Sequence, residues 1–103
     1  MALLSLLYPD QPDGRFDVRY YLGQHVPKVR ALWEPMGLTE IRLLHGISTP
    51  DGGPAPYRVL ALLTFTSVEA MRQALATHSA ELFAGIARYT DIKPVVQISE
   101  TLT

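Results

Sequence analysis

The sequence predicts one α+β domain in which two helices cover one face of a four-stranded antiparallel sheet. The chain has 103 residues, enough for one hydrophobic core and hardly enough for two domains. Short apolar runs bounded by turn residues alternate with two stretches of helical periodicity, in the order β-α-β-β-α-β. That order is typical of folds that place both helices on the same side of the sheet. We therefore expect a single domain over residues 1–103.

The first strand and the first helix come from the N-terminal third of the chain. Residues 2–8 form a compact apolar run followed by a turn-rich loop, which indicates a buried strand. A helical pattern then opens at Asp17 and stops at Gly37. Pro27 interrupts this helix because it lacks an amide hydrogen and leaves the Gly23 carbonyl without its usual donor. We expect the helix to bend or restart there.

Three further strands are predicted in the rest of the chain. Residues 38–47 and 57–66 are joined by a proline-rich loop that is too long for a two-residue hairpin. Residues 92–99 form the last strand, and Pro94 favours an edge position because proline cannot donate to a neighbouring strand.

The second helix lies between the last two strands. Thr66 and Glu69 have the spacing of a capping box that would begin it. One stripe at helical spacing carries Val68, Met71, Leu75, His78 and Leu82. Ser79 offers an alternative, in which it caps a separate short helix over residues 80–87.

The two predicted central strands are apolar on both faces. In this ferredoxin-like topology the central strands are the first and the third. Leucines occupy both faces of residues 2–8, and aliphatic side chains occupy both faces of residues 57–66. Two helices cover only one face, so the other would be an unusually large exposed apolar patch. A second copy of the chain is the simplest cover, which predicts a homodimer through the sheet face.

Composition excludes several function classes. The chain is 48% hydrophobic and 18% charged, which excludes wholesale disorder. Its net charge of −1 argues against a nucleic-acid partner. The absence of cysteine excludes disulfides, a thiol nucleophile and thiolate metal ligands. The apolar N-terminal run is too short for a membrane span and lacks a basic leader region, so we expect no membrane partner and a cytoplasmic location.

Three segments of the chain together resemble the EthD family, named for ethyl tert-butyl ether degradation. Phe16-Asp17-Val18-Arg19-Tyr20-Tyr21, followed by His25-Val26-Pro27, is similar to the family signature F-D-x-x-Y-Y-x-x-x-H-x-P. The loop over residues 46–57 and the tail over residues 89–99 resemble the same family. The resemblance implies a dimeric α+β barrel, in which two ferredoxin-like units pack sheet to sheet. Relatives on this barrel include cofactor-free monooxygenases, cyclases, isomerases and haem-handling enzymes, so the fold alone selects no chemistry.

Three residues are candidates for catalysis. His25 precedes the distorted helix position, and a histidine with a pKa of about 6.5 can act as general acid or base. On a regular helix Asp17, Tyr21 and His25 would lie on nearly one face, so Tyr21 could position the ring or donate to an oxyanion. The alternative is structural, with Asp17 capping the helix and the two rings satisfying backbone groups. His45 would be a second acid or base if its strand face lines the cavity, and a structural histidine otherwise.

Four further residues are candidate ligand contacts. Tyr20 and Trp33 would line a pocket for an apolar ligand or belong to the core. Arg42 points away from His45 and could counter an anion, although a solvated strand charge is the alternative. Asp91 could orient a group at the cavity mouth or simply cap a turn.

No motif calls for a cofactor. The sequence has no nucleotide-binding glycine motif and no metal-ligand spacing of histidines, so we expect neither a cofactor nor a metal. The predicted function is binding of a small hydrophobic or oxygenated organic molecule in the barrel cavity, with isomerase, lyase or cyclase activity in a degradation or secondary-metabolite pathway. The alternatives are a non-catalytic accessory protein of an oxygenase pathway, a cofactor-free monooxygenase and a haem-binding protein.

Overall fold

A four-stranded antiparallel sheet with the order β2-β3-β1-β4 forms one layer of the protein. The computed structural model describes residues 1–102, and its strands are β1 (Ala2–Pro9), β2 (Leu38–His45), β3 (Tyr57–Phe65) and β4 (Val95–Glu100). The two central strands are β1 and β3, as predicted, and β4 lies at an edge directly after Pro94. The fold is the predicted ferredoxin-like α+β fold.

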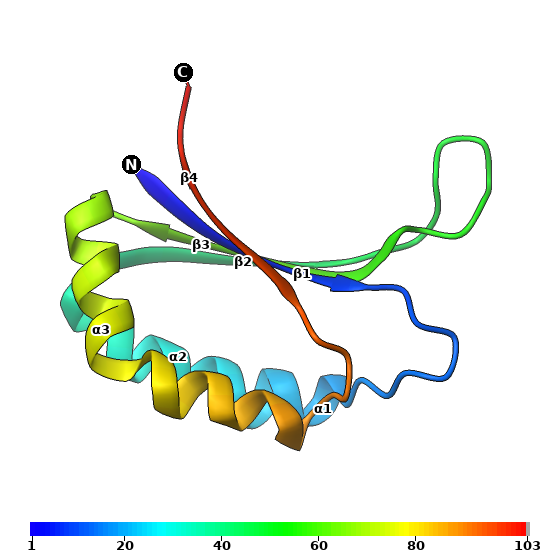
Figure 1. Cartoon of the computed structure of the whole chain (residues 1–103), viewed down its shortest axis with the longest axis horizontal. Helices are drawn as coiled ribbons and strands as arrows, with labels where there is room; N and C mark the ends of the chain where they lie inside the picture. The colour runs from blue at the N-terminus through cyan, green and yellow to red at the C-terminus, as the bar shows by residue number, and fades with distance from the viewer. Residues whose placement is uncertain (103) are drawn as a thin grey trace.

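The second layer consists of helices on one face of the sheet (Figure 1). The first helical stretch joins α1 (Val18–Tyr20), a π-helical segment (Tyr21–His25), α2 (Val26–Trp33) and a 3-10 turn (Glu34–Met36). The second comprises α3 (Val68–Ala84) and a 3-10 turn (Gly85–Arg88). Because α3 continues through Ser79, the alternative of a separate helix over residues 80–87 is wrong. No helix in residues 1–102 has the length and apolar character that crossing a membrane requires.

The predicted irregularity at Pro27 is a π-helical segment directly before it. The Val26 amide donates to the carbonyl of Tyr21, which precedes it by five residues, whereas in an α-helix the acceptor precedes the donor by four. Pro27 then falls in the first turn of α2, where a missing amide hydrogen costs little. The backbone therefore accommodates the proline by widening one helical turn before a regular α-helix begins again. This confirms the expected interruption of the α-helical hydrogen bonds.

Side-chain caps set where the two helical stretches begin. The Asp17 carboxylate accepts a hydrogen bond of 3.0 Å from the Tyr20 amide, so Asp17 is the N-cap. The hydroxyl of Ser67 accepts one of 3.0 Å from the Ala70 amide. The predicted capping box at Thr66 was therefore wrong by one residue. The strand extends through Phe65 and Thr66 is used in the turn, which leaves the next hydroxyl at the helix start.

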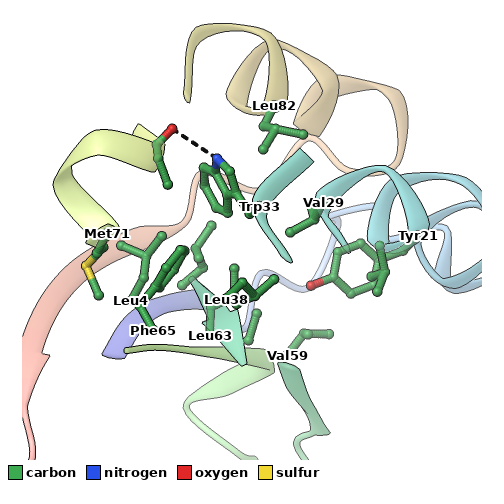
Figure 2. Packing of buried hydrophobic residues seen from close by; sticks show 14 of the residues in the cluster. Leu4, Tyr21, Val29, Trp33, Leu38, Val59, Leu63, Phe65, Met71 and Leu82 are labelled. Atoms are coloured by element: carbon green, nitrogen blue, oxygen red, sulfur yellow. Dashed lines mark hydrogen bonds between the residues drawn. The ribbon is translucent and has the colours of Figure 1, made fainter. Parts of the chain in front are cut away.

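The hydrophobic core lies between the two layers (Figure 2). Alternate residues of β1 and β3 point toward the helices and are buried: Ala2, Leu4, Leu6, Tyr8, Val59, Ala61, Leu63 and Phe65. Trp33 occupies the centre with 1% of its surface exposed, and its indole N–H donates to the Ala74 carbonyl at 3.0 Å. This hydrogen bond joins the two helical stretches beneath the sheet.

Within residues 1–102, the opposite face of the sheet carries no helix (Figure 1). Leu3 and Leu7 of β1 and Leu60 and Leu62 of β3 lie on it, each only partly buried. Val95, which pairs with Leu7, is exposed beside them. We call this surface the open face. The two-sided apolar pattern of the central strands is thus present in the folded chain.

Candidate functional site

A small apolar cavity lies between the helical layer and the sheet. Its volume is about 30 Å³. A single water needs roughly 10–15 Å³, so this cavity holds one or two waters or one small group of a ligand. Its walls are mostly aliphatic. The tyrosine and histidine side chains among them are Tyr8, Tyr21 and His25. We call it the inner cavity.

A larger hollow opens beside the inner cavity, between the start of the helical layer and β2. Its volume is about 320 Å³, at the lower end of the range of roughly 300–1,000 Å³ that is typical of small-molecule sites. It is lined by Phe16, Val18, Tyr21, Leu22, Leu43, Leu44, His45 and Val59. Tyr21 and Leu43 line both spaces, so this outer hollow adjoins the inner cavity.

His25 is half-buried in the wall of the inner cavity and is held by aromatic rings. Its ring lies parallel to that of Tyr21, with centroids 5.9 Å apart and planes at 16°, and 4.8 Å from the ring of Tyr89. Burial, followed by the nearby charge of Lys28, lowers the pKa of His25 below its ordinary value. The ring is therefore neutral at pH 7. None of the side-chain hydrogen bonds within residues 1–102 involves this ring, so its nitrogens are not fully buried.

The other side of His25 borders a polar groove between the first helical stretch and α3. This groove has a volume of about 480 Å³ and also contacts Tyr20, Gln24, Lys28 and Arg88. Lys28 Nζ lies 3.9 Å from a Glu81 carboxylate oxygen across the groove. His25 thus separates a water-poor apolar space from a charged, solvated one.

Tyr21 reaches from the π-helical segment toward the sheet (Figure 2). Burial raises the pKa of its hydroxyl far above the ordinary value, so the group stays protonated at neutral pH. Within residues 1–102, every fully buried side-chain nitrogen or oxygen has a hydrogen-bond partner. The Tyr21 hydroxyl has none, so it is not fully buried. It must therefore border open space, where it can donate to a bound molecule.

The structure brings four of the predicted residues to these spaces. His25 and Tyr21 line the inner cavity, while His45 lies on the helix-facing side of β2 at the rim of the outer hollow. The cavity-lining face of β2 is therefore the one that carries Ile41 and Leu43, a point that the sequence left open. Trp33 also lines the inner cavity but is a core residue whose indole hydrogen bond is already made.

The other predicted ligand contacts lie elsewhere. Tyr20 borders the polar groove, on the far side of His25 from the cavity. Arg42 is exposed on the open face opposite Leu62, as the alternation of β2 predicts. The Asp91 carboxylate accepts a 2.8 Å hydrogen bond from the Arg15 amide, so it fixes the loop between β1 and α1.

Tyr8 and Tyr89 are site residues that the sequence analysis missed. Tyr8 lines the inner cavity, and its hydroxyl lies 2.7 Å from that of Tyr89. The signal was present in β1, where Tyr8 continues the buried alternation of Leu4 and Leu6 and so carries a polar group into the core. Tyr89 follows the last helical turn, and nothing in its local sequence predicts that it returns to β1.

No group of three or more potential ligand side chains within residues 1–102 is placed to hold a metal ion. Besides the Trp33 indole, which is already bonded to the Ala74 carbonyl, the polar groups that line the two spaces are tyrosine hydroxyls and imidazoles. By themselves, these groups can transfer protons and can donate or accept hydrogen bonds.

Comparison with solved structures identifies the family. An EthD-like protein from Ralstonia eutropha JMP134 is 31% identical, with a TM-score of 0.89, over 99% of this chain and 92% of that one. The chain belongs to the EthD family. An ethyl tert-butyl ether d (EthD) family protein from Bacillus halodurans C-125 is 20% identical, with a TM-score of 0.79 and 99% of each chain covered.

The wider fold group includes an antibiotic biosynthesis monooxygenase. That structure is 14% identical, with a TM-score of 0.52 and all of both chains covered, so the likeness to this EthD-family chain is one of fold alone. No family model matches the sequence, and no curated protein matches it. The predicted resemblance to the EthD family is confirmed.

Proposed function

We propose that this EthD-family protein binds a small, mostly apolar organic molecule carrying at least one oxygen. The outer hollow would hold the body of the ligand, with one end directed toward the inner cavity. The sizes of the two spaces and their aliphatic and aromatic walls support this proposal. The few polar groups, from Tyr21, His25 and His45, would orient the ligand.

The proposed chemistry is proton transfer by His25. The observation that carries it is the position of the ring, which borders the apolar cavity on one side and the polar groove on the other. A neutral imidazole with a lowered pKa can accept a proton from the ligand and return it to another atom or, through the groove, to water. Isomerisation, dehydration and cyclisation all need such a base in a water-poor pocket, and none consumes an oxidant.

Tyr21 would assist by donating a hydrogen bond. Its raised pKa keeps the hydroxyl protonated, and its lack of a partner leaves it free to bind an oxygen of the ligand. A donor placed where negative charge develops lowers the barrier most in a pocket that excludes water. His45, at the rim of the outer hollow, would contact the ligand end nearest to solvent.

One observation favours a second function, binding without catalysis. No carboxylate or carbonyl in the described chain hydrogen-bonds to His25, although such a partner usually sets the tautomer of a catalytic histidine. In this alternative the pocket holds a reactive intermediate of a degradation pathway and the ring forms part of the wall.

The proposed assembly is a homodimer through the open face. Leu3, Leu7, Leu60 and Leu62 support it because they are apolar and unprotected by any helix in the single chain. In that dimer the helices lie outside, and each protomer keeps its own cavity.

Calorimetric titration with acetophenone and phenol tests ligand binding. We expect both to bind to the wild type and to raise its melting temperature by mass action. Leu22→Glu places a charge at the outer hollow from a position that is already 52% exposed, so it should abolish binding without unfolding the protein. Ile47→Glu, at a 90% exposed position that lines neither space, is the matched control. Equal affinity of the two variants, or no binding to the wild type, would contradict the proposal.

A further inference from the structure

The hydroxyls of Tyr8 and Tyr89 form a closed pair beside the inner cavity. They lie 2.7 Å apart, and each residue is only 1% exposed. Tyr8 comes from β1 and Tyr89 follows the 3-10 turn after α3, so the bond joins the sheet to the end of the helical layer. Neither hydroxyl bonds to any other group in residues 1–102.

A count of hydrogens shows that this pair holds a spare donor. Two hydroxyls carry two hydrogens, and the bond between them uses one. Burial raises the pKa of Tyr8 to about 12 and that of Tyr89 further, so both oxygens remain protonated at neutral pH. One O–H group is therefore left without an acceptor in a buried place, where an unmade hydrogen bond is costly.

The surroundings decide which hydroxyl carries the spare hydrogen toward a ligand. The Tyr89 ring is enclosed by the rings of Phe16, Tyr21 and His25, with centroids 5.3, 4.7 and 4.8 Å away, and it is not part of the cavity wall. Tyr8 does line the cavity. When Tyr89 donates to Tyr8, the Tyr8 hydrogen is free to point into the cavity, and a ligand oxygen there would satisfy both groups.

We propose that Tyr8, supported by Tyr89, is a specificity-determining residue that donates a hydrogen bond to an oxygen of the ligand. This inference rests on the proposed function and narrows its ligand class to molecules with a carbonyl or ether oxygen at one end of an apolar body. The inner cavity of about 30 Å³ admits only such a small group, while the outer hollow receives the remainder. Donation from Tyr89 polarises the Tyr8 hydroxyl and strengthens the bond that it makes.

Two ligands of nearly the same shape test this inference. Acetophenone has a carbonyl oxygen where α-methylstyrene has a methylene group. We expect the wild type to bind acetophenone about 3- to 10-fold more tightly, the range typical of one neutral hydrogen bond. Tyr8→Phe should remove most of this preference and leave the affinity for α-methylstyrene unchanged, whereas Tyr89→Phe should reduce the preference in part. Tyr57→Phe, outside all of these spaces, should keep it.

Several outcomes would overturn the inference. If both compounds bind to the wild type equally, or if Tyr21→Phe rather than Tyr8→Phe removes the preference, Tyr8 is not the donor and the proposed function still stands. If neither compound binds, the proposed function fails and this inference fails with it.

A second measurement needs no folded variant. The carbonyl stretching frequency of isotope-labelled acetophenone bound to the wild type should be lower than in a hydrocarbon solvent, and a hydrocarbon-like frequency would overturn the inference. If Tyr8→Phe does not fold, the double variant Tyr8→Phe/Tyr89→Phe removes both hydroxyls and leaves no unpaired partner.

Discussion

The imidazole of His25 stacks on the phenol ring of Tyr21, with centroids 5.9 Å apart and an angle of 16° between the ring planes. The two residues are the first and last of the π-helical segment. The widened turn before Pro27 therefore keeps both rings on the side of the helix that faces the sheet. Ring contacts, rather than a hydrogen bond, hold His25 in the cavity wall.

Because this stack helps to bury the imidazole, we expect the pKa of His25 to depend on the Tyr21 ring and not on its hydroxyl. Tyr21→Leu removes the aromatic cover and admits water, so the pKa of His25 should rise toward the ordinary value of about 6.5. Tyr21→Phe keeps the cover and should leave the pKa lowered. Titration of the imidazole protons by NMR distinguishes the two variants, and an unchanged pKa in Tyr21→Leu would show that other groups shield the ring.

The lowered pKa also makes stability depend on pH in a defined direction. Since His25 binds a proton more weakly in the folded chain than in the unfolded chain, the unfolded state gains protons first as the pH falls through about 6.5. The wild type should therefore lose stability between about pH 7.5 and 5.5 relative to His25→Asn, which cannot titrate there. Urea unfolding of both proteins at each pH measures the difference. A wild type that gains stability relative to the variant would reverse the sign and refute the shift.

A substitution on each face of β3 tests the proposed dimer. Leu60→Asp places a charge on the open face and should yield a folded monomer, because the charge would be buried only in the dimer. Leu63→Asp places the same charge in the core and should cost about 4 kcal/mol or more, enough to unfold the chain. Sedimentation and circular dichroism report the two outcomes. A wild type that sediments as a folded monomer at micromolar concentration would rule the dimer out.

Two glycines, one inside the first helical stretch and one at its end, should respond to alanine in opposite directions. Gly37 has a φ of 109°, and a Cβ there would lie 2.9 Å from Thr66 Oγ1, so Gly37→Ala should lower the free energy of unfolding by about 1–3 kcal/mol. Gly23 lies in the π-helical segment, and a Cβ there would meet no atom within 4 Å beyond the local helix backbone. Gly23→Ala should therefore raise the free energy of unfolding by about 0.4–1 kcal/mol. Thermal unfolding of both variants gives the comparison, and a Gly37→Ala variant as stable as the wild type would contradict the strain expected at this φ.

A substrate, once found, will distinguish catalysis from binding. His25→Ala should lower turnover by about 10²- to 10⁴-fold if the ring transfers a proton in the transition state. It should change only the affinity if the pocket merely holds the ligand. The variant must keep the wild-type melting temperature for either result to report on function, and unchanged turnover would remove His25 from the mechanism.

The candidate site was only partly predictable from the sequence. His25 and Tyr21 were found because a local signature places them before Pro27, and their spacing along one helix brings the rings together. The Tyr8–Tyr89 pair was missed because the two residues are 81 positions apart, and only the packing of β1 against the end of the helical layer joins them. For the same reason Asp91, which looked available for the cavity, is engaged by the Arg15 amide 76 positions away.

Local patterns in the sequence by themselves determined the element order, the central position of β1 and β3, the interruption at Pro27 and the end of the first helix at Gly37. These features depend on side-chain alternation, a missing amide hydrogen and a backbone angle, all of which act within a few residues. The face of β2 that lines the cavity, the pairing of Tyr8 with Tyr89 and the position of His25 between an apolar and a polar space were decided only by the tertiary structure. Each depends on how the sheet and the helical layer meet, which is a balance of packing over the whole core and has no signature in any one segment.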